Sequence, residues 1–294
     1  MLNPCDVLYD INDDIEMPLR IEGPTWFEVK GLFDDDTPGE SIDMALDVIS
    51  SCQQHIFIAV DDNASRIVSS LYQATESRPS RIMKTIPNLW PCLKITSQEE
   101  AKNELPAFVQ GISANRLLYI EPAERIDLMA ALNGVGQEMR SPRQILANWL
   151  SMKLEWVVVS GGEKAIHPQW VKDLKEQCVF AGVPFWFDSW GDFVSRPFVS
   201  LEDTLYEAAE NGNLKWGTID VDGKWYPFST PMLVHGRTGF WRPRECTMYL
   251  VGRDRSGCSL EGREWKELPY EVAERHYHHA RTISNGGGRY ESIL

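Results

Sequence analysis

Residues Trp156–Trp190 read WVVVSGGEKAIHPQWVKDLKEQCVFAGVPFWFDSW, and they decide the fold. The stretch begins with a nearly continuous apolar run, which is typical of a strand buried in a parallel sheet. An amphipathic segment follows, in which Pro168 suits the first turn of a helix and Gly182 supplies the left-handed residue that ends one. A second apolar run, Pro184–Asp188, comes directly afterwards. The stretch therefore predicts a strand, a helix and a second strand.

The same alternation of apolar runs and amphipathic segments extends back to residue 25. Between two of the runs, Ser97 and Glu100 form a capping box that predicts the start of a helix. Six strands separated by helices predict an α/β fold with a parallel sheet, either open and doubly wound or a partial (β/α) barrel. The predicted strands are Thr25–Lys30, His55–Val60, Asn88–Ile95, Arg116–Glu121, Glu155–Ser160 and Pro184–Asp188.

The rhythm changes after Trp190, where the chain becomes rich in glycine, proline and aromatic residues. Asp222 and Gly223 form a dipeptide that is typical of a β-hairpin turn. These features predict two parts: a barrel domain over residues 1–195, and a lid or insertion region over residues 196–294. The second part is expected to end in a flexible tail around Gly286–Gly288.

Nearly all the net charge lies at the N-terminal end. Residues 1–62 hold 15 acidic residues and two basic ones, which gives −13 of the net −14. Such a surface repels phosphate backbones, so we expect no nucleic-acid binding through this region. It is either a solvated face or a docking surface for a basic protein partner. The second alternative points to the run Asp34, Asp35 and Asp36.

Cysteine spacing and hydropathy exclude several classes of protein. The six cysteines lie at least 12 residues apart, so the chain has no CxxC motif for zinc or thiol redox chemistry and no local cluster motif. No apolar run approaches the roughly 20 residues that span a bilayer. The acidic start lacks the features of a signal peptide, so we expect a cytoplasmic protein with reduced thiols and no membrane contact.

The carboxyl ends of parallel strands meet at one edge of a sheet, where binding sites gather. Carboxylates at this edge could bind a divalent cation or transfer protons, or could instead pair with Arg66 and Arg125. No spacing matches a known metal motif, so no metal is expected. The residues at the predicted strand ends are Asp61, Asp62, Lys94, Glu121, Gly161, Gly162, Glu163 and Asp188.

Gly161 and Gly162 let a ligand approach the backbone closely, or they simply let the chain leave its strand. With Glu163 and Asp188 they form the predicted ligand-binding set. The candidate catalytic residues are Glu121, Glu163 and His167, although His167 also stands where a helix cap is expected.

Five segments, in order along the chain, resemble the phage gene-product-37/gene-product-68 family, whose members are related to radical S-adenosylmethionine (SAM) barrels. The likeness covers about residues 20–269, and the matching segments are His55–Ile67, Pro87–Trp90, Tyr119–Leu128, Trp156–Trp190 and Leu250–Pro269. This resemblance implies a partial (β/α) barrel of radical-SAM type.

The chain departs from that family at its chemistry. The family carries three clustered cysteines that would hold a [4Fe–4S] cluster, whereas the corresponding region here has Cys5 alone, so no iron–sulfur cluster is expected. Where the family has basic residues, this chain has Asp62-Asn63 and Asp188-Ser189. The family's V-G-K-K segment corresponds to Val251–Asp254, which reads VGRD.

Two hypotheses follow for the function. In the first, the chain is a non-catalytic derivative that binds another macromolecule, such as a host defence or nucleic-acid-handling protein, through its acidic surface. In the second, it is an enzyme that binds SAM or a nucleotide-like molecule at the barrel mouth, using Glu121 and Glu163.

Overall fold

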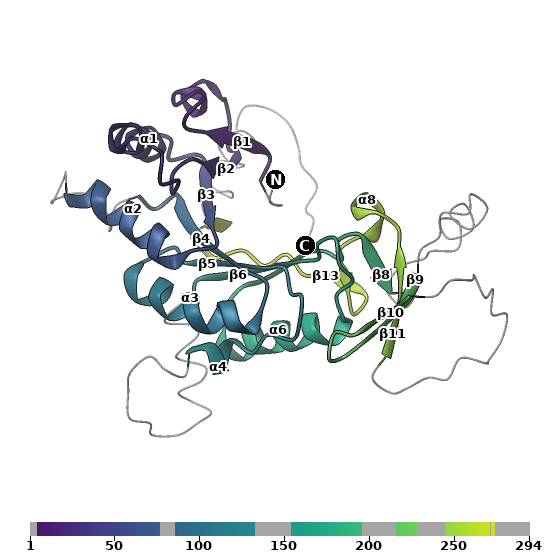
Figure 1. Cartoon of the computed structure of the whole chain (residues 1–294). Helices are drawn as coiled ribbons and strands as arrows, with labels where there is room; N and C mark the ends of the chain where they lie inside the picture. Colours follow the sequence, from purple (N-terminus) through teal and green to yellow (C-terminus); the bar gives the residue numbers. More distant parts are fainter. Residues whose placement is uncertain are drawn as a thin grey trace.

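The computed structural model describes residues 5–76, 86–132, 154–195, 216–227, 245–270 and 272–273. Its centre is a sheet of seven strands in which every neighbouring pair is parallel and the spatial order follows the chain order (Figure 1). A doubly wound sheet would reverse its strand order, so that alternative is excluded. The strands are β1 (Val7–Asp10), β2 (Trp26–Lys30), β3 (Ile56–Asp61), β4 (Leu89–Ile95), β5 (Leu117–Ile120), β6 (Trp156–Ser160) and β7 (Phe185–Ser189).

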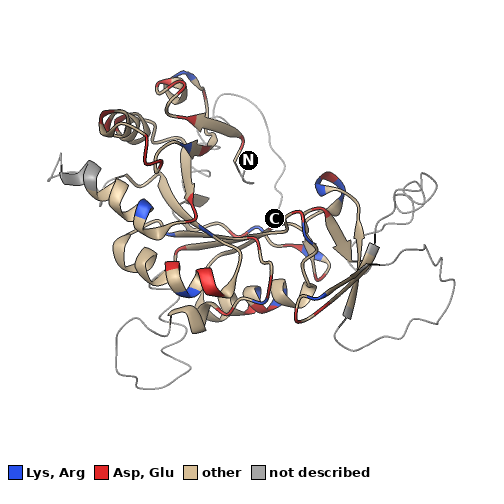
Figure 2. Ribbon diagram, viewed as in Figure 1, with Lys and Arg blue, Asp and Glu red and all other residues tan. Residues whose placement is uncertain are grey.

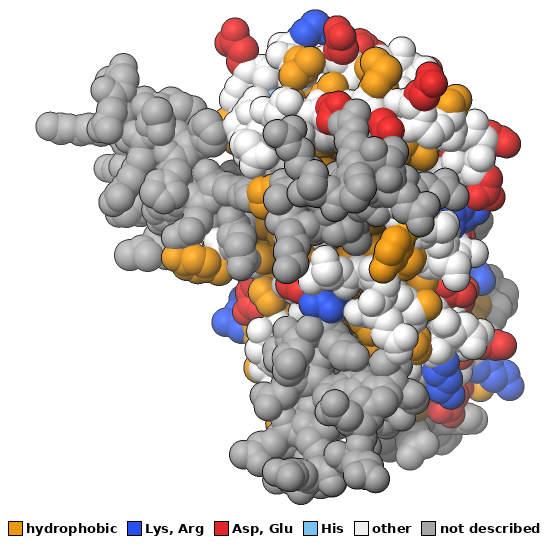
Figure 3. Space-filling view, turned by 90° about the vertical axis from the view of Figure 1, so that its left-hand side faces the viewer, with side chains coloured by type: hydrophobic (Ala, Val, Ile, Leu, Met, Phe, Trp, Pro, Cys, Tyr) orange, Lys and Arg blue, Asp and Glu red, His pale blue; other side chains and the backbone are white. Residues whose placement is uncertain are grey.

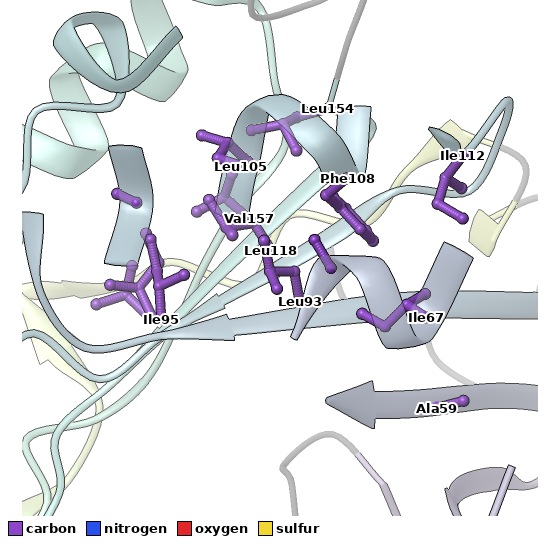
Figure 4. Packing of buried hydrophobic residues seen from close by; sticks show 14 of the residues in the cluster. Ala59, Ile67, Leu93, Ile95, Leu105, Phe108, Ile112, Leu118, Leu154 and Val157 are labelled. Atoms are coloured by element: carbon purple, nitrogen blue, oxygen red, sulfur yellow. The ribbon is translucent and has the colours of Figure 1, made fainter. Parts of the chain in front are cut away.

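Helices cover the outer face of this sheet, where most of the core lies (Figure 1). Ile67 and Phe108, from two of these helices, pack against strand residues that include Leu93 and Leu118 (Figure 4). The cap residues predicted from sequence are confirmed: Ser97 accepts a hydrogen bond from the Glu100 amide. The helices are α1 (Gly39–Ser51), α2 (Ala64–Glu76), α3 (Gln98–Gly111), α4 (Leu128–Leu132) and α6 (Pro168–Ala181), with a short 3-10 helix, η1 (Met17–Arg20).

The inner face of the sheet is concave and filled by tryptophans. The rings of Trp26 in β2 and Trp156 in β6 lie 5.8 Å apart, although three strands separate β2 from β6. Trp90 and Trp186 also contact Trp156, at 5.9 and 6.0 Å between ring centroids. A flat sheet cannot bring β2 to β6, so the sheet curls into a half-barrel. The prediction of a partial (β/α) barrel is confirmed.

The C-terminal region adds a small antiparallel sheet in the order β10-β9-β11-β8. The predicted hairpin is confirmed, because β9 and β10 pair around a turn in which Gly223 has φ of 88°. Backbone hydrogen bonds also join Phe187 of β7 to Trp265, so this region covers the β7 edge of the half-barrel. Its elements are β8 (Phe193–Ser195), β9 (Trp216–Asp220), β10 (Trp225–Pro227), β11 (Glu245–Leu250), α8 (Arg253–Ser256), β12 (Ser259–Leu260) and β13 (Arg263–Glu264).

The six predicted strands are present with boundaries that differ by about one residue. Strand β1 was not predicted, because only four residues pair with β2 and acidic residues surround them. The predicted tail at Gly286–Gly288 and much of the region 196–248 lie outside the described residues. Among the helices of the described segments, none is long and apolar enough to cross a membrane.

Candidate functional site

Polar side chains gather inside the half-barrel at the carboxyl ends of β4–β7. Successive strand residues point to opposite faces, so every second residue enters the concave side. Along β6 these inward residues are Trp156, Val158 and Ser160. Each strand therefore starts with an apolar residue at the floor of the half-barrel and ends with a polar one at its mouth. The polar residues at the mouth are Lys94, Tyr119, Glu121, Ser160 and Asp188.

These residues form a hydrogen-bonded network across four strands. Lys94 Nζ lies 2.8 Å from Glu121 Oε2, and the Tyr119 hydroxyl donates to Glu121 Oε1 at 3.4 Å. Ser160 Oγ donates to Asp188 Oδ2 at 2.8 Å. Burial raises the pKa of Tyr119, against an opposing interaction with Ser160, so its hydroxyl keeps its proton at neutral pH.

The C-terminal region contributes one residue, Arg253 from α8, to this network. Its Nη2 atom donates to Ser160 Oγ at 2.9 Å and to Asp188 Oδ2 at 3.4 Å. Burial opposes the charge on Arg253, but Tyr119 and Asp188 outweigh it and raise the pKa of the guanidinium. The mouth thus joins the half-barrel to the region predicted as a lid, although a lid motion stays a prediction.

Asp188 is the most deeply placed charged group of the network. Its side chain is 2% exposed, and among the described residues its Oδ1 atom has no hydrogen-bond partner. A buried acceptor without a donor costs about 1–3 kcal/mol, and more when it is charged. Such atoms call for an explanation, of which a bound ligand is one.

The structure brings together some of the predicted site residues and separates others. Glu121 and Asp188 belong to the network, and Gly162 lies beside Glu121. Glu163 is exposed and has no hydrogen bond or ion pair with the described residues. His167 caps α6, with Nδ1 accepting from the Gln169 amide at 3.1 Å. The structure therefore gives His167 a role in the fold, and neither His167 nor Glu163 joins the network.

Gly161 allows two backbone segments of the half-barrel to lie in close contact. A side chain there would overlap the carbonyl of Trp190, because the β6 exit and the loop after β7 lie in contact. The Gly161 amide donates to the Ser189 carbonyl at 2.7 Å. Close approach at Gly161 is thus between two parts of this chain, whereas Gly162 has room for a side chain.

Sequence reasoning missed Tyr119, Ser160 and Arg253. The alternation along β5 and β6 could have identified the first two, since they stand at inward positions near the carboxyl ends of predicted strands. Strand alternation could not identify Arg253, which lies 65 residues beyond Asp188 on the short helix α8. The available signal was its place in the VGRD segment, where the resembled family also has a basic residue.

Some of the acidic residues of the N-terminal part lie after β2 and at the end of β3. Asp34, Asp35 and Asp36 are exposed, and the side chain of Asp35 is 83% exposed. Arg66 pairs with Asp61 at 2.8 Å, as the ion-pair alternative for the strand-edge acids predicted, and with Asp62 at 3.1 Å. The hydrogen bond and charge of Asp61 raise the pKa of Arg66. Acidic side chains outnumber basic ones in the upper, N-terminal part of the molecule (Figures 2 and 3).

The thiols and carboxylates do not form a metal site within the described residues. No group of three histidine, cysteine, aspartate or glutamate side chains lies together there. The six cysteines are free thiols, and burial raises the pKa of those on the strands and helices of the half-barrel, such as Cys92 and Cys178. The absence of an iron–sulfur cluster stays a prediction, for which the iron content of the purified protein is the measurement.

Comparison with known proteins identifies the family of this chain but no activity. No curated protein matches the chain. The family model described as "Protein of unknown function (DUF5131)" matches residues 11–269. That description names neither phage proteins nor radical chemistry, so the resemblance to the phage family stays a prediction. Because the match covers most of the sequence, the chain belongs to the DUF5131 family.

Proposed function

We propose that this protein is an enzyme that binds a small polar molecule at the mouth of its half-barrel. Lys94, Tyr119, Glu121, Asp188 and Arg253 are the residues that would contact the ligand. Sites of parallel α/β folds lie at this edge, where residues from several strands converge. SAM and nucleotides stay candidate ligands, and Glu163 leaves the proposed site because it lies outside the network.

The free Oδ1 atom of Asp188 is the observation that supports the proposal most directly. Every other carboxylate oxygen of the network has a donor: Glu121 accepts from Tyr119 and Lys94, and Asp188 Oδ2 accepts from Ser160. Most buried side-chain polar atoms in proteins have a hydrogen-bond partner, so this oxygen calls for one. An amine or hydroxyl of a ligand would supply the missing donor.

Asp188→Asn tests this proposal. Since hydrogen bonds to charged groups contribute about 1.5–3 kcal/mol, we expect the variant to bind its ligand about tenfold more weakly or worse. The measurement is thermal unfolding with SAM, nucleotides and amino acids, where a ligand at 100 times its Kd adds about 2.7 kcal/mol to the wild type. Asp254→Asn is the control, because Asp254 is exposed on α8. If every molecule that stabilises the wild type stabilises Asp188→Asn equally, the site lies elsewhere.

A second candidate function, binding of a basic protein, is supported by the acidic loops. The side chains of Asp35 and Asp62 are largely exposed, and Arg66 is their partner in the described structure. Exposed like charges repel each other, which disfavours the folded state. They also speed encounter with a basic partner, in a way that salt suppresses.

Changing Asp34, Asp35 and Asp36 together to Asn tests this second function. We expect slower association with a basic partner recovered by pull-down, while the melting temperature stays the same or rises because repulsion falls. Association rates measured at low and physiological salt give the result. In the control, two exposed acidic residues on helices, Glu99 and Glu176, are changed to Gln. If the triple variant recovers the partner as well as the wild type does, with the same association rates, these loops are only a solvated surface.

A further inference from the structure

At the mouth, the positively charged side chains are more exposed than the negatively charged ones. The side chains of Lys94 and Arg253 are 36% and 46% exposed. Glu121 and Asp188, their partners, are 24% and 2% exposed. A molecule that enters the mouth therefore meets two cations first and the carboxylates beneath them.

The outer groups also hold unused hydrogen-bond donors. Lys94 has three N–H groups and pairs with Glu121 through its ammonium, and Arg253 has five N–H groups but reaches Ser160 and Asp188 through Nη2. In contrast, both oxygens of Glu121 already accept hydrogen bonds. The exposed side of the network therefore offers donors to a ligand, and within the described residues its buried side has one free acceptor, Asp188 Oδ1.

Lys94 and Arg253 both lie near one residue, Tyr119. Lys94 Nζ is 5.9 Å from the centre of the Tyr119 ring, and Arg253 interacts with the Tyr119 hydroxyl. Both cations thus interact with the same phenol, one at its ring and the other at its hydroxyl. Groups of this kind bind carboxylates and phosphates, and arginine does so with two parallel hydrogen bonds.

From this geometry we infer that the ligand carries an anionic group, a phosphate or a carboxylate, which lies over Tyr119 between Lys94 and Arg253. A neighbouring amine or hydroxyl of the same ligand donates to Asp188 Oδ1. This inference rests on the proposed binding function and specifies the class of its ligand. It also gives the C-terminal region a role, since the region supplies half of the anion site through Arg253.

The acidic loops do not pair with the two cations of the mouth. Asp34, Asp35 and Asp36 follow β2, and within the described residues none of them forms an ion pair with Lys94 or Arg253. Physiological salt screens charges beyond about 8 Å, whereas direct contacts with Lys94 and Arg253 are screened much less. Arg66 also neutralises part of the acidic charge nearest to β4.

Matched pairs of ligands test the inference on the full-length protein. Comparing the binding of adenosine monophosphate with that of adenosine tests for recognition of a phosphate. Comparing methionine with methioninamide, in which a neutral amide replaces the carboxylate, tests for recognition of a carboxylate. Calorimetric Kd values are measured for the wild type, Lys94→Ala, Arg253→Ala and Asp188→Asn. The controls are Lys102→Ala, on the exposed face of α3, and Arg255→Ala, exposed on the same short helix as Arg253. Arg253→Lys tests for rescue by charge, and melting temperatures check that each variant is folded.

We expect the anionic member of at least one pair to bind about tenfold more tightly than its neutral partner. Lys94→Ala and Arg253→Ala should each remove most of this preference, Arg253→Lys should restore part of it, and both controls should behave as the wild type. Equal binding of anionic and neutral members, with a dependence on Asp188, overturns the inference and leaves the proposed function standing. A complete lack of binding in every arm overturns both.

Discussion

Replacing Trp156 by alanine is expected to lower the free energy of unfolding by about 3–5 kcal/mol, as for other buried aromatic residues. Trp156 is fully buried and contacts Trp26, Trp90 and Trp186. Its removal would leave a cavity in the middle of the concave face. Urea unfolding followed by circular dichroism measures the change, and a loss below about 1 kcal/mol would contradict a filled half-barrel.

A double-mutant cycle turns this experiment into a test of the curvature. In a flat sheet Trp26 and Trp156 would lie four strand spacings apart, about 19 Å, and their substitutions would be additive. In the half-barrel their rings touch, so we expect a coupling free energy of about 0.5–1.5 kcal/mol.

Trp170 provides the matched control for the cycle. It is equally buried, but it belongs to the core on the outer, helix-covered face, where its indole donates to the Val221 carbonyl. Trp170→Ala should destabilise the protein strongly and yet be additive with Trp26→Ala. Additivity of the Trp26–Trp156 pair as well would contradict the half-barrel.

The strands were predictable because strands buried on both faces are almost continuously apolar. Residues Trp156–Val159 show this most clearly, and all four are fully buried. The curvature was not visible in that pattern, since a flat and a curled sheet bury the same apolar strands. Only the resemblance to barrel proteins favoured the half-barrel before the contact of Trp26 with Trp156 established it.

Part of the site was predictable because the end of a buried strand marks the edge of its sheet. This rule identified Lys94, Glu121 and Asp188, and all three belong to the network. It also selected Glu163, which follows the strand by three residues and turns to solvent. The rule cannot identify Arg253, since its place at the mouth depends on how the second sheet packs on the first.

Gly161→Ala is expected to destabilise the protein by about 3 kcal/mol, because the new methyl group would overlap the backbone at Trp190 and Gly191. Backbone on both sides of the contact leaves no flexible side chain to move away. Urea unfolding measures the effect. A variant as stable as the wild type would mean that the β6 exit and the loop after β7 do not lie in contact.

Gly162→Val is expected to separate ligand binding from stability at the neighbouring position. A Cβ atom at Gly162 would come no closer than 3.7 Å to any other group, with Glu121 Oε2 the nearest, so the free energy of unfolding should change by less than about 1 kcal/mol. The valine methyl groups would nevertheless stand beside Glu121 at the mouth and exclude a ligand from the backbone there. We therefore expect a loss of ligand affinity of about tenfold or more, measured as a Kd, together with a nearly unchanged unfolding curve. If a stable Gly162→Val protein binds the ligand with normal affinity, the two glycines only let the chain leave its strand. The ligand would then lie on the side of the network formed by Asp188 and Arg253.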